Sequence, residues 1–583
     1  MSWDLKIVGG TVVDGTGAAP READVAVKDG RIVAIGACEG EAARVIDASG
    51  MLVTPGFVDI HTHYDGQATW DAEMAPSSWH GVTTCVMGNC GVGFAPVRPA
   101  DHDRLVRLME GVEDIPGAAL AEGLPWTWES FPEYMEHLDR SPHTIDIAAQ
   151  VPHDALRVYV MGDRAVSGEP ATEADIDAMK VLLADALDAG AVGISTGRSD
   201  NHRTADGDPT PASEAARAEL VGLAEVFAGR DRGVLQVVSD FDMAAGPERF
   251  DPEFDLLEDM ASAAGGRPLS TSLLQRINDP SQWKRVLARV EAAVENGLNL
   301  RVQAAPRPIG VLLGMETTFH PFMGHPTFKA HAHLPLAERV AKLKEPAVRA
   351  QILSERPDAV AGDGSAIPPL ADALLERINE AAFLMYRLTD PPVYEPPPEA
   401  SLAAEAVRES KPALGVLYDA LLEDEGEAMI YFAIFNYMTL SLDNVYSMIT
   451  HPLALTSLSD GGAHVGTVCD ASFPTTVLQW WARDRPGTKL TLEDAVYKLT
   501  GANAAYMGFD DRGVIAEGKL ADLNVIDFEG LRLHKPSLAA DLPAGGKRLL
   551  QRASGYRYTV KTGVVTFEDG VSTGAMPGKL VRL

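Results

Sequence analysis

The chain has few cysteines, few basic residues for its acidic content and no long apolar run, and each shortage excludes a class of protein. Four cysteines in 583 residues are too few for a disulfide framework, so we expect reduced thiols. The 50 Lys and Arg residues are outnumbered by 83 Asp and Glu residues, and the formal charge of −33 would repel nucleic acid and anionic membranes. We therefore expect neither as a partner.

No segment has the length or composition of a membrane anchor or a secretion signal. The longest uncharged, mainly apolar run, residues 428–442, is shorter than the roughly 20 residues that cross a bilayer, and it contains Asn436. The first residues lack the basic start and apolar core of a signal peptide. We expect a cytoplasmic protein that acts on a small molecule, and the sequence leaves a homo-oligomer open.

Short apolar segments alternate with amphipathic helices along most of the chain. The clearest helix spans residues 172–189, with Thr172 as its N-cap and Gly190 after its end. Eight apolar segments lie near residues 58, 84, 147, 193, 236, 271, 302 and 457. Eight strands that alternate with helices predict an α/β fold, a TIM-like (β/α)8 barrel. The long gap at about 305–450 predicts a helical insertion between strands 7 and 8, which would overhang the barrel mouth.

Both chain ends contain short strand-like segments with hairpin signals. The Asp29-Gly30 and Asp569-Gly570 pairs are typical of tight turns between strands. We predict one small β-sandwich domain from residues 1–54 and 508–583, outside a barrel domain of residues 55–507.

Three of the predicted barrel strands end in residues that bind metals. His61 and His63 end the first strand, and because side chains alternate along a strand, both point to one face. Cys90 follows the second strand between glycines that permit a sharp turn, and Asp460 follows the eighth. The carboxyl ends of parallel barrel strands meet at one face, where enzymes of this fold build their sites. The pattern predicts a metal-dependent hydrolase.

Other polar residues are weaker candidates, each with an ordinary structural alternative. Four could bind substrate at the barrel mouth: His153, His202, Arg307 and His464. The alternatives are a solvated loop for His202 and His464, and a salt bridge to the insertion for Arg307. Four histidines of the insertion are irregularly spaced, so we interpret them as loop residues and not as a second metal site: His320, His325, His331 and His333. Residues 88–93 do not match a dinucleotide-binding pattern, so we expect no nucleotide cofactor.

Taken together, the motifs resemble those of the amidohydrolase superfamily. They are residues 55–63 (PGFVDIHTH), 88–91 (GNCG), 459–461 (SDG) and 516–522 (AEGKLAD). Within the superfamily, the Tyr64-Asp65 continuation and the cysteine after the second strand resemble the N-acyl-D-amino-acid deacylases, or D-aminoacylases. The resemblance implies hydrolysis of an N-acyl amide by a metal-activated water. It also implies a zinc ion, or another divalent metal, held by His61, His63 and Cys90. Asp460 would be the general base, and its additional role as a metal ligand is left open.

The chain departs from this family at two strands. The deacylases carry a histidine at the end of strands 5 and 6, whereas residues 234–240 and 269–274 contain none. The fourth strand also offers no lysine that could be carbamylated into a bridging ligand. We therefore predict a single metal ion, because hydroxyls and amides bind zinc poorly. Two alternatives stay open: hydrolysis or lysis of another bond (ester, lactone, cyclic amide or C–C), and a barrel that has lost catalysis.

Overall fold

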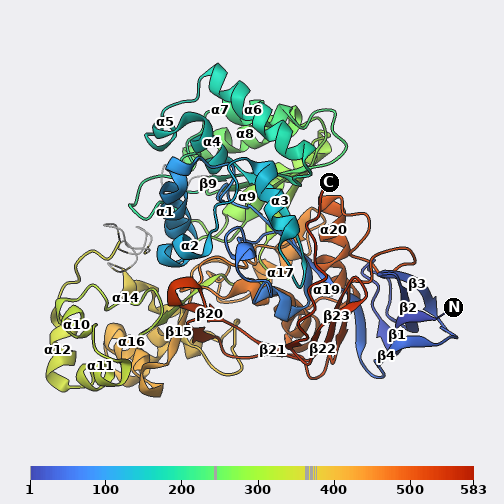
Figure 1. The fold of residues 1–583 in the computed structure, drawn as a ribbon. Helices are drawn as coiled ribbons and strands as arrows, with labels where there is room; N and C mark the ends of the chain where they lie inside the picture. Colours follow the sequence, from blue (N-terminus) through green and yellow to red (C-terminus); the bar gives the residue numbers. More distant parts are fainter. Residues whose placement is uncertain (1, 242–245, 362–366, 368–371, 373–374, 376) are drawn as a thin grey trace.

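The centre of the molecule is a parallel sheet of eight strands that curls into a barrel (Figure 1). The computed structural model describes residues 2–241, 246–361, 367, 372, 375 and 377–583. Neighbouring strands follow the order β16-β12-β11-β10-β9-β8-β7-β6. Their bounds are β6 (Phe57–Asp59), β7 (Val82–Met87), β8 (Asp146–Pro152), β9 (Gly193–Arg198), β10 (Val234–Ser239), β11 (Leu269–Leu273), β12 (Leu300–Ala304) and β16 (Ala454–Thr456). The predicted barrel is confirmed, with every strand close to its expected position.

The first and last barrel strands are held together by two kinds of contact. Thr62 and Gly461 form a parallel bridge just beyond β6 and β16. Within the strands, the buried Asn503 side chain donates to the carbonyl oxygens of Val58 (2.9 Å) and Thr456 (3.1 Å). The closed barrel therefore brings residues near 61 and 460 side by side.

Strands buried on both faces and helices with one apolar face explain the barrel's layers. All seven residues of β8 are buried, as expected for a parallel strand between the barrel interior and a helical layer. Helix α6 (Glu173–Asp188) begins with the capping box of Thr172 and Asp175. The helices that follow the second to sixth barrel strands include α1 (His102–Glu113), α2 (Gly117–Gly123), α3 (Phe131–Arg140), α4 (His153–Met161), α7 (Arg217–Glu225), α8 (Phe250–Ala263) and α9 (Gln282–Glu295).

Both chain ends build one nine-stranded sheet with its own apolar core, as the sequence predicted for a shared terminal unit. Its order is β24-β23-β22-β17-β5-β1-β2-β3, with β4 paired to β1, so the C-terminal strands and the N-terminal strands form two blocks that join where β17 pairs with β5. The bounds are β1 (Trp3–Val12), β2 (Arg21–Lys28), β3 (Arg31–Gly36), β4 (Ala42–Asp47), β5 (Leu52–Pro55), β17 (Leu523–Ile526), β22 (Tyr556–Lys561), β23 (Val564–Glu568) and β24 (Val571–Ser572). The domain boundaries themselves stay a prediction.

Two parts of the C-terminal region leave this sheet and contact the barrel. Residues 532–554 contain the antiparallel pairs β18 (Arg532–Leu533) with β21 (Ala553–Ser554) and β19 (Ser537–Ala539) with β20 (Arg548–Leu550). Leu549 N in β20 donates to Val465 O at 2.6 Å, in the loop after the last barrel strand. The final residues also run along the barrel, where Leu580 bridges Ile147 in parallel.

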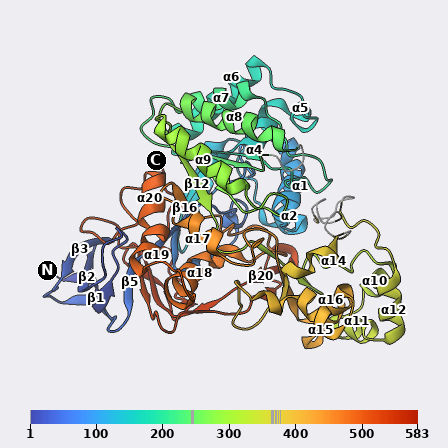
Figure 2. The same ribbon diagram turned by 180° about the vertical axis from the view of Figure 1, so that it is seen from behind.

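The insertion between β12 and β16 contains a small sheet as well as the predicted helices. Its three antiparallel strands are β13 (Gly310–Gly314), β15 (Met429–Ala433) and β14 (Met385–Arg387), in that order. The surrounding helices include α10 (Pro326–His331), α11 (Leu336–Leu343), α12 (Pro346–Ser354), α14 (Ile378–Ala381), α15 (Leu402–Glu409) and α16 (Ala413–Leu421). Figure 2 shows the insertion and the terminal sheet on opposite sides of the molecule. Of the helices that the structure describes, none is long and apolar enough to cross a membrane.

Candidate metal centre

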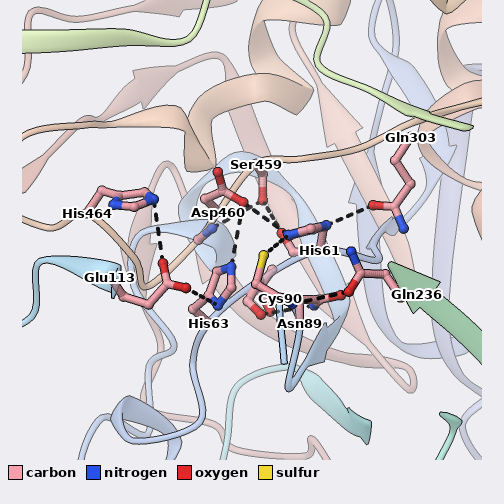
Figure 3. Close-up of polar contacts among 12 residues, drawn as sticks. His61, His63, Asn89, Cys90, Glu113, Gln236, Gln303, Ser459, Asp460 and His464 are labelled. Atoms are coloured by element: carbon pink, nitrogen blue, oxygen red, sulfur yellow. Dashed lines mark hydrogen bonds and ion pairs between the residues drawn. The ribbon is translucent and has the colours of Figure 1, made fainter. Parts of the chain in front are cut away.

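Three predicted ligands converge at the carboxyl ends of β6 and β7 (Figure 3). One ligand atom each from His61, His63 and Cys90 lies within 4.8 Å of the others, and all three side chains are buried. His61 Nε2 and Cys90 Sγ are 3.3 Å apart. Zinc bonds to nitrogen and sulfur in a tetrahedral site place ligand atoms about 3.3–3.8 Å apart. The spacing fits an ion of this kind.

Asp460 completes the cluster from the far end of the chain. Its Oδ1 lies 3.4 Å from His61 Nε2 and 3.7 Å from His63 Nε2. The loop that carries it is attached to the histidine strand by backbone hydrogen bonds, from Asp460 N to His61 O (3.2 Å) and from His63 N to Gly461 O (2.7 Å). Leu458, Asp460 and His464 all adopt a positive φ in this loop. Such conformations in residues other than glycine concentrate at functional sites.

The glycines around Cys90 are required by close backbone packing. A Cβ on Gly88 would lie 2.3 Å from Gln150 O, and one on Gly91 would lie 2.8 Å from Gly197 N. Cys90 itself has a φ of 56°, and its N–H donates to Gln236 Oε1 at 3.1 Å. The tight turn thus points the thiol at the histidines.

Each of the two histidines has a polar side chain next to the ring nitrogen that faces away from the cluster. His61 Nδ1 lies 2.9 Å from Gln303 Oε1, and His63 Nδ1 lies 3.2 Å from Glu113 Oε1, so each Nε2 faces the centre. The second contact meets the ion-pair distance but is poorly aligned for a hydrogen bond. Burial lowers the pKa of His61 to about 4 and that of His63 to about 3. Both rings are neutral near pH 7, which is the form that binds metals.

The centre concentrates groups that carry negative charge when they ionise. Burial raises the pKa of the Cys90 thiol well above its usual range, and the nearby Glu113 and Asp460 carboxylates raise it further. In the described part of the chain, neither Glu113 nor Asp460 forms an ion pair with a lysine or arginine. The two imidazoles, the thiol and the carboxylate therefore fit a divalent cation, which would supply the missing positive charge.

Two of the predicted substrate-binding residues border the centre. His464 Nε2 lies 3.5 Å from Glu113 Oε2, and its side chain is 30% exposed. Burial lowers the pKa of His464 to about 4. His202 is close to Gly197, whose added Cβ would lie 3.5 Å from His202 Nδ1 and 2.3 Å from Cys90 O. His202 thus lies on the Cys90 side of the centre, and burial lowers its pKa as well.

The structure does not bring His153 or Arg307 to the cluster. Both ring nitrogens of His153 are engaged, by Thr196 Oγ1 and by Glu219 Oε1, each at 2.9 Å. Arg307 is buried, pairs with Asp470 at 2.7 Å and stacks 3.7 Å above the Tyr394 ring. Their positions after barrel strands place the backbone at the expected face, but packing directs both side chains to protein partners.

Comparison with known proteins decides the family. Residues 44–567 match the model of the amidohydrolase family. The chain belongs to this family. It is 27% identical to the D-aminoacylase of Alcaligenes xylosoxydans xylosoxydans over 99% of this chain and 97% of that protein.

Two solved structures of similar proteins cover the whole chain. One is the N-acyl-D-glutamate deacylase of Bordetella bronchiseptica, complexed with zinc and a phosphonate that mimics the tetrahedral intermediate. It is 26% identical, with a TM-score of 0.64 and full coverage of both chains. The other is a D-aminoacylase with a binuclear metal centre, 25% identical, with the same TM-score and coverage. The predicted resemblance is confirmed.

Sequence reasoning missed the residue behind His63 in this amidohydrolase. Glu113 is the last residue of α1, and it is buried beside His63, a predicted ligand some 50 residues earlier in the chain. One signal was available, because Glu113 and Asp114 stand at the C-terminal end of a helix, where the macrodipole disfavours negative charge.

The barrel strands that lack histidines carry residues with other partners. Gln236 on β10 accepts a hydrogen bond from Cys90 N, and Ser270 on β11 accepts one from Gln303 Nε2 at 2.9 Å. Asp240, just after β10, pairs with Arg276 at 2.5 Å. Among the described residues, His61, His63 and Cys90 are the one set of histidine, cysteine and acidic side chains whose spacing suits a metal ion.

Proposed function

We propose that this amidohydrolase cleaves the C–N bond of an N-acyl amino acid or a related small amide. The supporting observation is the convergence of His61, His63, Cys90 and Asp460 at the carboxyl ends of the first, second and eighth barrel strands. The family and the names of similar proteins, which are deacylases of N-acyl-D-amino acids, support the same bond. A single zinc ion, or another divalent metal, is the proposed cofactor.

Asp460 is the proposed general base. A divalent ion at the centre supplies Lewis acidity, which activates a water molecule and polarises the scissile carbonyl. The Asp460 side chain is 17% exposed, so its carboxylate faces both the ligands and the open side of the site. It accepts the proton of the attacking water and returns that proton to the leaving nitrogen. Its 3.4 Å approach to His61 Nε2 also suits a fourth ligand.

His464 and His202 are the proposed substrate contacts. Both border the centre, and His464 is partly exposed. His153 and Arg307 are no longer proposed for this role, because their polar groups are committed to Glu219 and Asp470. A reducing compartment suits the four cysteines, all of which are unpaired.

A substrate panel tests the proposal. Metal-stripped protein is reconstituted with zinc and assayed on N-acyl-D- and N-acyl-L-amino acids, and on ester and lactone analogues. We expect zinc-dependent release of an amino acid from an N-acyl-D-amino acid, and its loss in Cys90→Ser. The residues that replace the family's histidines on β10 and β11 favour a second candidate, hydrolysis of an ester or a lactone. Turnover of these analogues with no amide cleaved would replace the first proposal with the second.

A further inference from the structure

One buried carboxylate contacts two histidines that lie about 400 residues apart in the sequence. Glu113 Oε1 is 3.2 Å from His63 Nδ1, and Glu113 Oε2 is 3.5 Å from His464 Nε2. The backbone N–H of His464 also donates to Glu113 O. In Figure 3, Glu113 lies on the opposite side of the His63 ring from Asp460. Glu113 therefore stands behind a ligand and not among the ligands.

This placement is unfavourable unless a cation lies nearby. The Glu113 side chain is 1% exposed and stands at the C-terminal end of α1, where the helix dipole is negative. Throughout the described residues, its ion pairs are with histidines alone. A buried carboxylate without a cationic partner lowers the stability of a fold by several kcal/mol. A cation on the far side of the His63 ring would offset that penalty.

We propose that Glu113 is a positioning residue of the metal centre. It accepts the His63 Nδ1 proton, which selects the tautomer whose Nε2 lone pair faces the ligand cluster. The same carboxylate fixes His464 at the open side of the site, where the ring can contact substrate. This inference rests on the metal site proposed above. A carboxylate behind a ligating histidine increases the basicity of that ligand and its affinity for metal.

The loop that carries His464 packs closely against the insertion, which restricts the position of His464 relative to Glu113. A Cβ on Gly466 would lie 1.8 Å from Thr318 Oγ1 of the insertion. Thr318 N donates to Gly466 O (3.1 Å), and Leu312 N donates to Thr467 O (2.7 Å). The loop is thus held between the insertion and the end of α1, and Glu113 connects it to the histidine strand.

Zinc affinity and metal-free stability together test the role of Glu113. Glu113→Gln keeps the shape and removes the charge. The matched control is Glu110→Gln, one turn earlier on α1, where the carboxylate accepts the N–H of Gly117 at 2.9 Å. Zinc affinity is measured by competition with a chromophoric chelator, and the melting temperature is measured on the metal-free proteins.

We expect Glu113→Gln to bind zinc about 10–100-fold more weakly, as is usual for groups behind a metal ligand. Its metal-free melting temperature should equal or exceed that of the wild type, because the cost of burying an ionisable carboxyl group is gone. Glu110→Gln should match the wild type in zinc affinity. Glu113→Asp, which keeps the charge on a shorter side chain, should bind zinc with intermediate affinity and guards against a folding defect in the first variant.

Zinc affinity of Glu113→Gln within twofold of the wild type would overturn the inference. So would a lower metal-free melting temperature with unchanged zinc affinity, since that pattern marks a purely structural residue. A wild-type protein that binds no zinc would instead refute the proposed function, so the two failures are distinguishable.

Discussion

Two buried clusters of ionisable groups lie at opposite ends of the barrel, and they differ in how their charge is balanced. At the amino ends of the strands, the fully buried Lys561 lies 2.7 Å from Asp146 and 2.8 Å from Asp522. Arg512 also binds Asp146, at 2.6 Å. At the carboxyl ends, Glu113 and Asp460 contact histidines that burial keeps neutral.

The difference separates a structural cluster from a functional one. The cluster at the amino ends of the strands, here called the lower cluster, contains its own cations. It joins the terminal sheet to the barrel, because Lys561 is in β22 and Asp146 begins β8. The cluster at the carboxyl ends, here called the upper cluster, has an excess of acidic groups, which only a cation from outside the protein would balance. Buried charge that a protein balances by itself supports the fold, whereas unbalanced buried charge indicates a site for a ligand.

The largest effect is expected when Asp460 of the upper cluster is substituted. Asp460→Asn keeps the shape of the side chain and removes the base, so we expect turnover to fall by about 10² to 10⁴. Zinc should stay bound through His61, His63 and Cys90. Steady-state kinetics together with metal analysis checks both statements. A near-normal rate in this variant would show that another group moves the proton.

The next largest effect is expected when Lys561 of the lower cluster is substituted. Lys561→Met leaves the buried Asp522 carboxylate without its lysine partner, while Asp146 keeps Arg512, and we expect the free energy of unfolding to fall by about 3–5 kcal/mol. Zinc affinity should not change, because the cluster is at the other end of the barrel. Lys579→Met is the control, since only its backbone N–H contacts Asp146, at 2.8 Å. Chemical unfolding measures the difference, and an equal loss in both variants would contradict the prediction.

Adding zinc should convert the upper cluster into a balanced one. A ligand at 100 times its dissociation constant stabilises the folded state by about 2.7 kcal/mol. We expect that gain for the wild type in thermal unfolding with and without zinc, and none for Cys90→Ser. A gain that persists in Cys90→Ser would place the ion elsewhere.

The last effect, which is spread over several pH units, concerns a third acidic group at the carboxyl ends of the strands. Burial raises the pKa of Asp154 to about 7 from its usual 3.8, despite a hydrogen bond from Ala212 N. The folded state therefore favours the protonated form, and stability is lost as the pH rises from about 4 to 7. The slope is at most about 1.4 kcal/mol per pH unit.

Asp154→Asn should flatten this pH dependence in the metal-free protein. Urea unfolding at pH 5 and pH 8 provides the measurement. Wild-type and variant curves that stay parallel across this range would show that Asp154 does not titrate as its burial implies.

Features that depend on local periodicity could be predicted from the sequence. The eight barrel strands are short apolar segments between amphipathic helices, and the clustering of His61, His63 and Cys90 agrees with strand alternation and glycine turns. Asp460 could be placed with them because parallel strands of a barrel end at the same face.

Features that depend on packing between distant segments could not be predicted from the sequence. Glu113 is beside His63 and His464 only because the end of α1 meets the loop after β16. The topology placed His153 and Arg307 at the correct face, but the direction of each side chain depends on Glu219 and Asp470, which no local pattern reveals. The three-stranded sheet of the insertion was missed for the same reason, since Gly310 of β13 pairs with Ala433 of β15, which is about 120 residues later in the chain.

The pairing of the two chain ends in one sheet has a consequence for synthesis on the ribosome. Strand β5 lies between β1 and β17, so one edge of β5 lacks its partner until residues 523–526 have been made. The barrel likewise cannot close until Gly461 reaches Thr62. At about 5–20 residues per second, the nascent chain waits roughly half a minute or more with these edges exposed. Exposed strand edges promote association between chains, so this amidohydrolase should depend on chaperones most strongly before its last 130 or so residues emerge.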